Sequence, residues 1–175
     1  DMKYCIDTNS LIDAHNRYYP PDVFPKWWSL FQETVQEGIV KTSQAVFGAR
    51  KKEDTLHKWV KNQKDFIIPL FEDIQIESRN ILERFPRLVD TRKQRSEGDP
   101  FVIASAKVTN TKVITSENYT RNLEKPNIPD VCIVLNIPCL SLLDFMRDIV
   151  GTYNDINILA KQQISISAIT FLIFI

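Results

Sequence analysis

The stretch KYCIDTNS, residues 3–10, decides the fold. Lys3 to Asp7 form a short run of strand-favouring residues, and the polar side chains that follow can cap the start of a helix. The run therefore predicts a buried strand that passes at Asp7 into a helix ending near Arg17. Ligands of open α/β sheets bind outside the carboxyl ends of the strands. Asp7 is thus the first candidate site residue, because a buried carboxylate is costly unless it is paired or metal-bound.

Downstream of this stretch, predicted helices alternate with predicted strands. Trp27, Trp28, Phe31 and Val35 form one helical stripe, which Gly38 ends. Further helices are predicted over residues 43–62, 72–85, 100–108 and 141–150, and strands over 66–69, 112–115 and 131–135. This alternation predicts an α/β fold whose parallel sheet is covered by helices on both faces.

The composition fits one domain, since 175 residues can bury a sizeable core. The formal net charge is zero, so binding to nucleic acid would depend on local basic patches. Cys5, Cys132 and Cys139 have no metal-type spacing, and we interpret them as reduced thiols of a cytoplasmic protein. No stretch is long and apolar enough to predict a membrane span.

Two further acidic residues stand where they can join Asp7. Asp99 precedes Pro100 at the predicted start of a helix, where it could also act only as a cap. Glu117 lies two residues beyond the predicted strand 112–115. Carboxylates held together repel one another unless a cation neutralises them. Hard oxygen ligands favour Mg²⁺ or Mn²⁺, so the three acids predict a site for one of these ions.

Three motifs, in order, resemble the acidic motifs of PIN-domain ribonucleases: IDTNSLID (6–13), GDPFVIASA (98–106) and VITSE (113–117). The stretches YYPPDVFPKWW, FPRLVD (85–90) and NIPDVC (127–132) look like an uncharacterised bacterial and archaeal branch of that superfamily, close to VapC-like toxins. The resemblance covers about residues 3–150. It implies a three-layer α/β/α fold with a central parallel sheet of about five strands.

The resemblance also implies chemistry, namely metal-dependent cleavage of single-stranded RNA. Asp7, Asp99 and Glu117 would be the catalytic metal ligands for Mg²⁺ or Mn²⁺, with Asn9 and Thr115 as nearby hydrogen-bonding residues. The family further implies a toxin paired with an antitoxin protein, and often a homodimer.

One position departs from the PIN pattern, because Gly48 stands where a further acidic ligand is expected. Gln44, one helical turn earlier, could supply a neutral oxygen. Either Gly48 is an inactivating change, natural or engineered, or the alignment is displaced by several residues. Under the first explanation, replacing Gly48 by Glu should raise Mn²⁺-dependent cleavage.

Two basic clusters flank the predicted cleft in sequence and could hold RNA phosphates, or else form a solvated face. They are Arg50, Lys51 and Lys52, and Arg92, Lys93 and Arg95, with Lys107 and Arg121 as additional candidates. The expected division is a nuclease domain over 1–151 and an extension over 152–175. The apolar extension could add a strand to a sheet edge or to another subunit.

The sequence leaves two main functions open. The first is an RNA-cleaving enzyme, either fully active or with its cleavage activity reduced by Gly48. The second is a catalytically inactive PIN-like module that binds RNA or protein. A phosphatase or a DNA flap nuclease built on the same acids ranks third, since no insertion for threading DNA is apparent.

Overall fold

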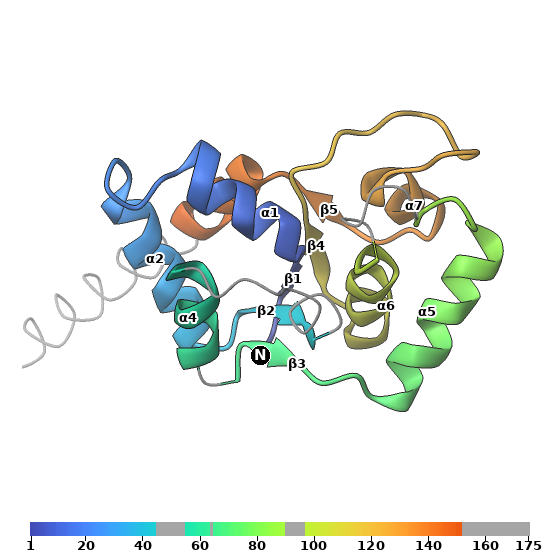
Figure 1. The fold of residues 1–175 in the computed structure, drawn as a ribbon, viewed down its shortest axis with the longest axis horizontal. Helices are drawn as coiled ribbons and strands as arrows, with labels where there is room; N and C mark the ends of the chain where they lie inside the picture. The colour runs from blue at the N-terminus through green and yellow to red at the C-terminus, as the bar shows by residue number, and fades with distance from the viewer. Residues whose placement is uncertain (45–54, 64, 90–96, 152–175) are drawn as a thin grey trace, which may run out of the picture. The chain divides into compact units, whose positions relative to one another are not determined.

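The computed structural model describes residues 1–44, 55–63, 65–89 and 97–151. Residues Asp1–Leu142 form one compact unit, and a second unit begins at Leu143. The first unit is built on a sheet of five short strands, β1 (Tyr4–Ile6), β2 (Val40–Ser43), β3 (Ile67–Ile68), β4 (Lys112–Ile114) and β5 (Cys139–Leu140). Their order is β3-β2-β1-β4-β5 and every neighbouring pair is parallel (Figure 1). The first strand of the sequence is thus the central strand of the sheet.

Helices cover both faces of this sheet. One side carries α1 (Thr8–Asp13), a π-helical segment (Ala14–Tyr18), α2 (Pro25–Gln36) and α4 (Thr55–Asn62). The other side carries α5 (Glu72–Arg84), α6 (Asp99–Thr109) and α7 (Ile128–Val134). The predicted three-layer α/β/α arrangement with a parallel sheet of about five strands is therefore confirmed. Residues 142–151 form a further helix.

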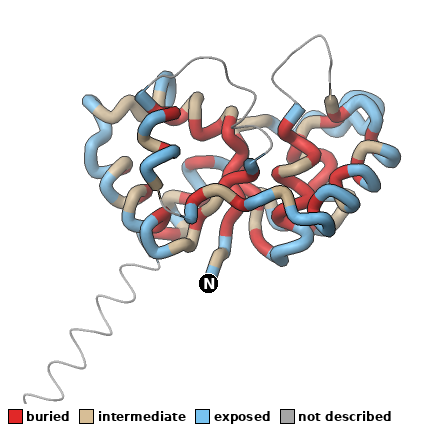
Figure 2. The backbone as a smooth tube through the Cα atoms, turned by 60° about the horizontal axis from the view of Figure 1, so that its bottom comes forward, coloured by how far each residue is buried: buried red, intermediate tan, exposed pale blue. Residues whose placement is uncertain are grey.

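Alternation along the strands divides the core between the two faces. Cys5 of β1 pairs with Val113 of β4, and both side chains join the apolar cluster built by α5, α6 and α7. Tyr4, Ile6 and Ile114 alternate with them and are also buried. Figure 2 shows the strands as the buried centre of the tube. Burial on both faces explains why β1 has no polar side chain before Asp7.

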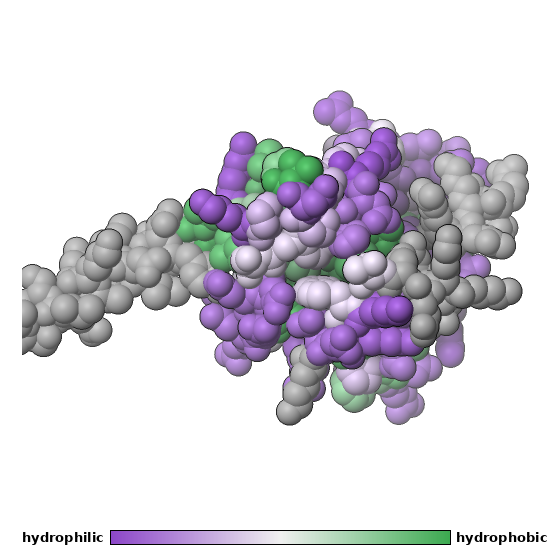
Figure 3. Space-filling model, turned by 60° about the vertical axis from the view of Figure 1, so that its left-hand side comes forward, coloured by the Kyte–Doolittle hydropathy of each residue, from purple (hydrophilic) through white to green (hydrophobic). Residues whose placement is uncertain are grey.

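The opposite face is filled by aromatic rings. Phe31 is fully buried at the centre of this cluster, with ring centroids 5.2 Å from Trp27, 5.7 Å from Trp28, 6.0 Å from Trp59 and 6.3 Å from Phe66. The predicted helical stripe is thus a core-packing stripe. The outer surface on the side of α2 and α4 is mostly hydrophilic, with small hydrophobic areas (Figure 3).

Several predicted elements are confirmed and others are wrong. The helices near 72–85 and 100–108 and the strands near 66–69 and 112–115 are present within a few residues. The helix predicted from Ser43 is wrong at its start, because Val40–Ser43 form β2 between β1 and β3. The strand predicted over 131–135 is wrong, because these residues lie in α7 and its end. β5 was not predicted, since two residues carry no periodic signal.

Residues 131–135 do not form the predicted strand because helix-starting residues precede them. Asn127 and Asp130 form a reciprocal capping box at the start of α7, and Pro129 lies in the first turn. These contacts start a helix in spite of the β-branched residues that follow.

Within the residues that the structure describes, no helix has both the length and the hydropathy needed to cross a bilayer.

Candidate metal centre

Asp7 lies where β1 ends and α1 begins. Its backbone N–H donates to the Ile114 carbonyl (2.9 Å), which fixes the end of β1 against β4. Its carboxylate caps α1, accepting from the backbone N–H groups of Asn9 (3.1 Å) and Ser10 (3.3 Å) and from the Ser10 hydroxyl (2.7 Å). Burial raises the pKa of Asp7, these hydrogen bonds oppose the rise, and Asp13 adds a smaller increase. The predicted cap at the strand end is confirmed.

Ser10 joins the two sides of the candidate centre. While its hydroxyl donates to Asp7, its oxygen accepts from the Ser116 backbone N–H (2.6 Å) and the Ser116 hydroxyl (3.0 Å). The Asp13 carboxylate, 3.4 Å from the Ser116 hydroxyl, is an alternative acceptor for the one proton of that hydroxyl. One buried hydroxyl therefore links the helix that follows β1 to the loop that follows β4, 106 positions later.

Glu117 is held at the edge of the same loop. Its backbone N–H donates to the Thr115 hydroxyl (3.2 Å), and its carboxylate accepts from the backbone N–H of Ile128, the first residue of α7 (2.8 Å). The Thr115 hydroxyl is also 3.4 Å from that of Ser10. The backbone of Glu117 is thus held by the strand end, and its carboxylate by the start of a helix.

Asp130 fixes the loop that links Glu117 to α7. Its carboxylate is buried and accepts from the N–H groups of Thr120 (2.9 Å), Arg121 (2.8 Å) and Asn127 (2.8 Å) and from the Thr120 hydroxyl (2.7 Å). Burial raises the pKa of Asp130, but the four hydrogen bonds together outweigh it and hold the pKa below its usual value. One side chain therefore organises both ends of the 118–127 loop.

Asp99 is the acid that these hydrogen bonds leave unsatisfied. It is the first residue of α6, is 3% exposed, and has no hydrogen bond or ion pair from its carboxylate among the described residues. Burial, together with the charges of Asp7 and Glu117, raises the pKa of Asp99 to about 9. Gly98, not Asp99, is the N-cap of α6, and Pro100 follows one position later in the helix than predicted. Capping therefore does not account for the Asp99 side chain.

The donor chemistry of these residues fits a hard cation. Three carboxylates and nearby hydroxyls offer oxygen ligands, and the raised pKa of Asp99 records negative charge that a cation would neutralise. In the described part of the chain, no three His, Cys, Asp or Glu side chains are already spaced to enclose a metal ion.

The other predicted site residues fall into two groups. Asn9 and Thr115 lie beside Asp7 and Glu117, as described above. Gln44 is exposed, and its side-chain oxygen accepts from the Leu70 N–H (3.2 Å), so its observed contact is with the loop after β3. Several predicted residues lie outside the described ranges, namely Gly48, Arg50, Lys51, Lys52, Arg92, Lys93 and Arg95.

Three features of the centre were not anticipated from the sequence: the bridging role of Ser10, the participation of Ser116, and the hub formed by Asp130. The spacing Asn127-Ile128-Pro129-Asp130 carried a usable signal, because it matches a capping box with proline in the first turn. The Ser10–Ser116 contact had no local signal.

Comparison with known proteins gives a family and two structural likenesses. Among solved structures, the chain is similar to one in the crystal structure of VapBC2 from Rickettsia felis bound to a DNA fragment from their promoter. Identity is 14%, the TM-score is 0.49, and the match covers 80% of this chain and 98% of that one. For the structure of FitAB bound to IR36 DNA, identity is 17%, the TM-score is 0.45, and coverage is 79% and 94%.

No curated protein matches the chain. The model of a family described as a domain of unknown function, DUF4411, matches residues 4–152. That match spans all five strands and the three acids of the candidate centre. The chain therefore belongs to the DUF4411 family.

Proposed function

We propose that this chain is a metal-dependent endoribonuclease of the PIN type, which hydrolyses phosphodiester bonds in single-stranded RNA. The observation that carries the proposal is Asp99, a buried carboxylate without a hydrogen-bond donor among the described residues, beside the charges of Asp7 and Glu117. Uncompensated buried charge costs stability, and such arrangements concentrate at functional sites. The order of the three acidic motifs, which resembles that of PIN ribonucleases, supports the same reaction.

In the proposed mechanism, Asp7, Asp99 and Glu117 hold Mg²⁺ or Mn²⁺. When bound, the ion supplies Lewis-acid chemistry, which acidifies water and offsets charge on the phosphate. Ser10 and the Ile128 N–H keep the carboxylates of Asp7 and Glu117 oriented. The resemblance to PIN-domain ribonucleases implies products with a 5′-phosphate and a 3′-hydroxyl.

The biological setting follows from the motif resemblance. We propose a cytoplasmic toxin that pairs with a cognate antitoxin protein and forms a homodimer. The basic residues of the two clusters at 50–52 and 92–95 would contact RNA phosphates. The competing function, a catalytically inactive module that binds RNA or protein, draws its support from Gly48.

Mn²⁺-dependent cleavage of a labelled single-stranded RNA tests the reaction. We expect slow cleavage by the natural chain, and its loss in Asp7→Asn, because the amide removes one charge from the ion site while keeping the shape of the cap. Asp22→Asn, at an exposed position, is the matched control. Cleavage that survives equally in Asp7→Asn would refute the assignment of Asp7, and absence of cleavage with intact RNA binding would favour the inactive module.

The substitution Gly48→Glu tests whether a ligand has been lost. We expect at least a tenfold tighter Mn²⁺ affinity and a corresponding gain in cleavage rate, since a fourth carboxylate adds charge to a shared cation site. Titration calorimetry and the same cleavage assay measure the two effects. Gly48→Gln, which adds similar bulk without charge, separates ligation from helix propensity. If neither affinity nor cleavage rises, the alignment at this position is wrong.

A further inference from the structure

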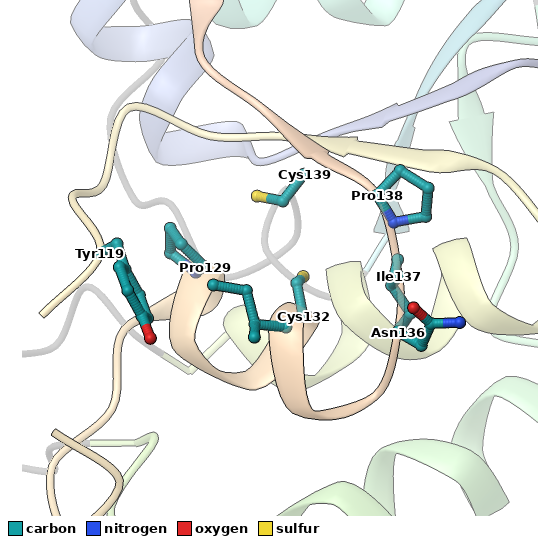
Figure 4. A pocket seen from close by; sticks show the side chains of 8 residues that line it. Tyr119, Pro129, Cys132, Asn136, Ile137, Pro138 and Cys139 are labelled. Carbon is teal, nitrogen blue, oxygen red and sulfur yellow. The ribbon is translucent and has the colours of Figure 1, made fainter. Parts of the chain in front are cut away.

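A pocket lies between α7 and the edge strand β5, with a cavity volume of about 490 Å³. Figure 4 shows Tyr119 and Pro129 at one end, Asn136 at the other, and Cys132 and Cys139 between them. Concave sites of this size with mostly apolar walls and a few polar groups are typical of binding sites for small molecules. None of these residues has been used in the proposed hydrolysis.

Two residues that line the pocket are close to Glu117 and its partner Ile128 along the chain. The Glu117 carboxylate accepts a hydrogen bond from the N–H of Ile128 (2.8 Å), which joins two segments of the chain. Tyr119 is two residues after Glu117, and Pro129 directly follows Ile128. A polymer held at Glu117 would therefore place its next unit at the mouth of the pocket.

The chemistry of the pocket walls suits a flat aromatic group. The Tyr119 ring is 50% exposed, and the Arg121 guanidinium lies over it, 6.0 Å from the ring centroid. A hydrogen bond with Cys139, together with burial, raises the pKa of the Cys132 thiol, so this wall stays uncharged. Aromatic faces backed by arginine are stacking surfaces for nucleobases, and the Asn136 amide can pair with a base edge.

The near wall is also rigid. Asp130 binds the N–H groups of Thr120 and Arg121, the two residues after Tyr119, and that of Asn127, two residues before Pro129. The Asn127 amide donates to the Asn118 carbonyl (2.8 Å), which closes the loop on the other side of Tyr119. Tyr119 is thus placed between two fixed peptide groups, so little ordering is needed on binding.

We propose that this pocket is a nucleobase subsite, in which an unpaired base next to the cleaved phosphate stacks on Tyr119. The inference rests on the proposed function for its substrate class, single-stranded RNA, and adds the residues that hold the base. A paired base cannot leave its stack without cost, so the subsite also selects single strands over duplexes.

The test is RNA affinity without metal, measured by fluorescence anisotropy with a labelled single-stranded octamer in EDTA. We expect Tyr119→Ala to weaken binding at least about tenfold, because stacking on one aromatic residue contributes that much. Tyr119→Phe should retain the affinity, since the ring and not the hydroxyl makes the contact. Tyr18→Ala is the matched control, because Tyr18 is 47% exposed and carries Arg17 over its ring at 5.6 Å.

A second probe reports stacking itself. An octamer with one 2-aminopurine should lose fluorescence on binding to the natural chain and to Tyr119→Phe, but not to Tyr119→Ala. A duplex of the same sequence should bind at least tenfold more weakly. Equal affinity of Tyr119→Ala and the natural chain would overturn the subsite. So would a change confined to self-association in sedimentation, which would make this surface a protein contact.

The failures of the two proposals are distinguishable. If Tyr119→Ala loses RNA affinity but the natural chain shows no Mn²⁺-dependent cleavage, the subsite proposal stands and the nuclease proposal is refuted. If Tyr119→Ala cleaves RNA with an unchanged KM, the nuclease proposal stands and the subsite proposal is refuted. If the natural chain binds no single-stranded RNA, the subsite is refuted directly.

Discussion

Asp99→Asn is expected to raise the free energy of unfolding of the metal-free protein by about 2 kcal/mol at pH 8. Asp99 is buried beside the charges of Asp7 and Glu117, and its pKa is raised to about 9. At pH 8 most folded molecules therefore keep the Asp99 carboxyl protonated, which costs free energy relative to the ionised unfolded state. The amide has nearly the same shape and is neutral in both states, so it avoids that cost. A gain of stability on removing a functional group is the signature of a site selected for activity.

The pH dependence of this gain has a defined sign. The folded-state pKa of Asp99 lies above the unfolded value of 3.8, so the folded state binds the proton more tightly. Its contribution to stability is fully present below pH 3.8 and is lost as the pH rises towards 9. The advantage of Asp99→Asn should therefore be absent near pH 4 and increase steadily up to pH 9.

Urea unfolding in EDTA at a series of pH values measures the effect, with Asp22→Asn as the exposed control. Adding Mn²⁺ at about 100 times its Kd should stabilise the natural chain by about 2.7 kcal/mol. Asp99→Asn should show little of this stabilisation, because it lacks one proposed ligand. A variant less stable than the natural chain in EDTA at pH 8 would mean that Asp99 has a structural partner instead.

Asp130→Asn is expected to destabilise the protein by about 2–4 kcal/mol at pH 7. Each carboxylate oxygen of Asp130 accepts two hydrogen bonds, one pair from the N–H groups of Thr120 and Arg121 and the other from Asn127 N–H and the Thr120 hydroxyl. In Asn one oxygen becomes an NH₂ group, which cannot accept. The Thr120 hydroxyl can turn round, but at least one backbone N–H is left facing a donor.

The consequence should extend to Glu117, because Asn127 precedes the Ile128 N–H that holds its carboxylate. Thermal or urea unfolding gives the stability, and Mn²⁺ titration gives the effect on the centre, for which we expect weaker affinity. The cost should diminish below pH 3.8, where the depressed pKa of Asp130 no longer favours the folded state. Asp73→Asn, an exposed acid with one local hydrogen bond to Ile74, should change stability by less than about 0.5 kcal/mol.

The fold could be predicted where the hydrophobic periodicity of a segment agreed with the residues that begin or end a helix or strand. The stripe of α2 and the strand before Asp7 have strong local signals, and both are present. β2 was missed because Val40–Ser43 is half polar, and its Thr42 hydroxyl is satisfied only by the Ile6 carbonyl of the neighbouring strand (2.9 Å). That partner lies 36 residues away, so no local window contains the reason for the strand.

The positions of the three acids relative to strands and helices could be predicted from the sequence, but the hydrogen-bond network around them could not. Asp7 and Glu117 follow strand ends, and parallel strands bring their ends to one edge of a sheet. By contrast, the hydrogen bond between Ser10 and the Ser116 N–H and the convergence of four donors on Asp130 depend on loop conformation, which composition does not encode. The residue types were visible in the sequence, whereas their partners were not.

The central position of β1 has a consequence for how the protein is made. Tyr4 pairs on one side with Val40 and on the other with Lys112, so during synthesis β1 must wait for most of the sheet before its second edge is covered. Pairing over such a separation is slow, because a long loop must close first. The Glu117 carboxylate accordingly gains its Ile128 N–H donor only after the chain has passed Ile128, so a shorter nascent chain lacks this part of the candidate centre.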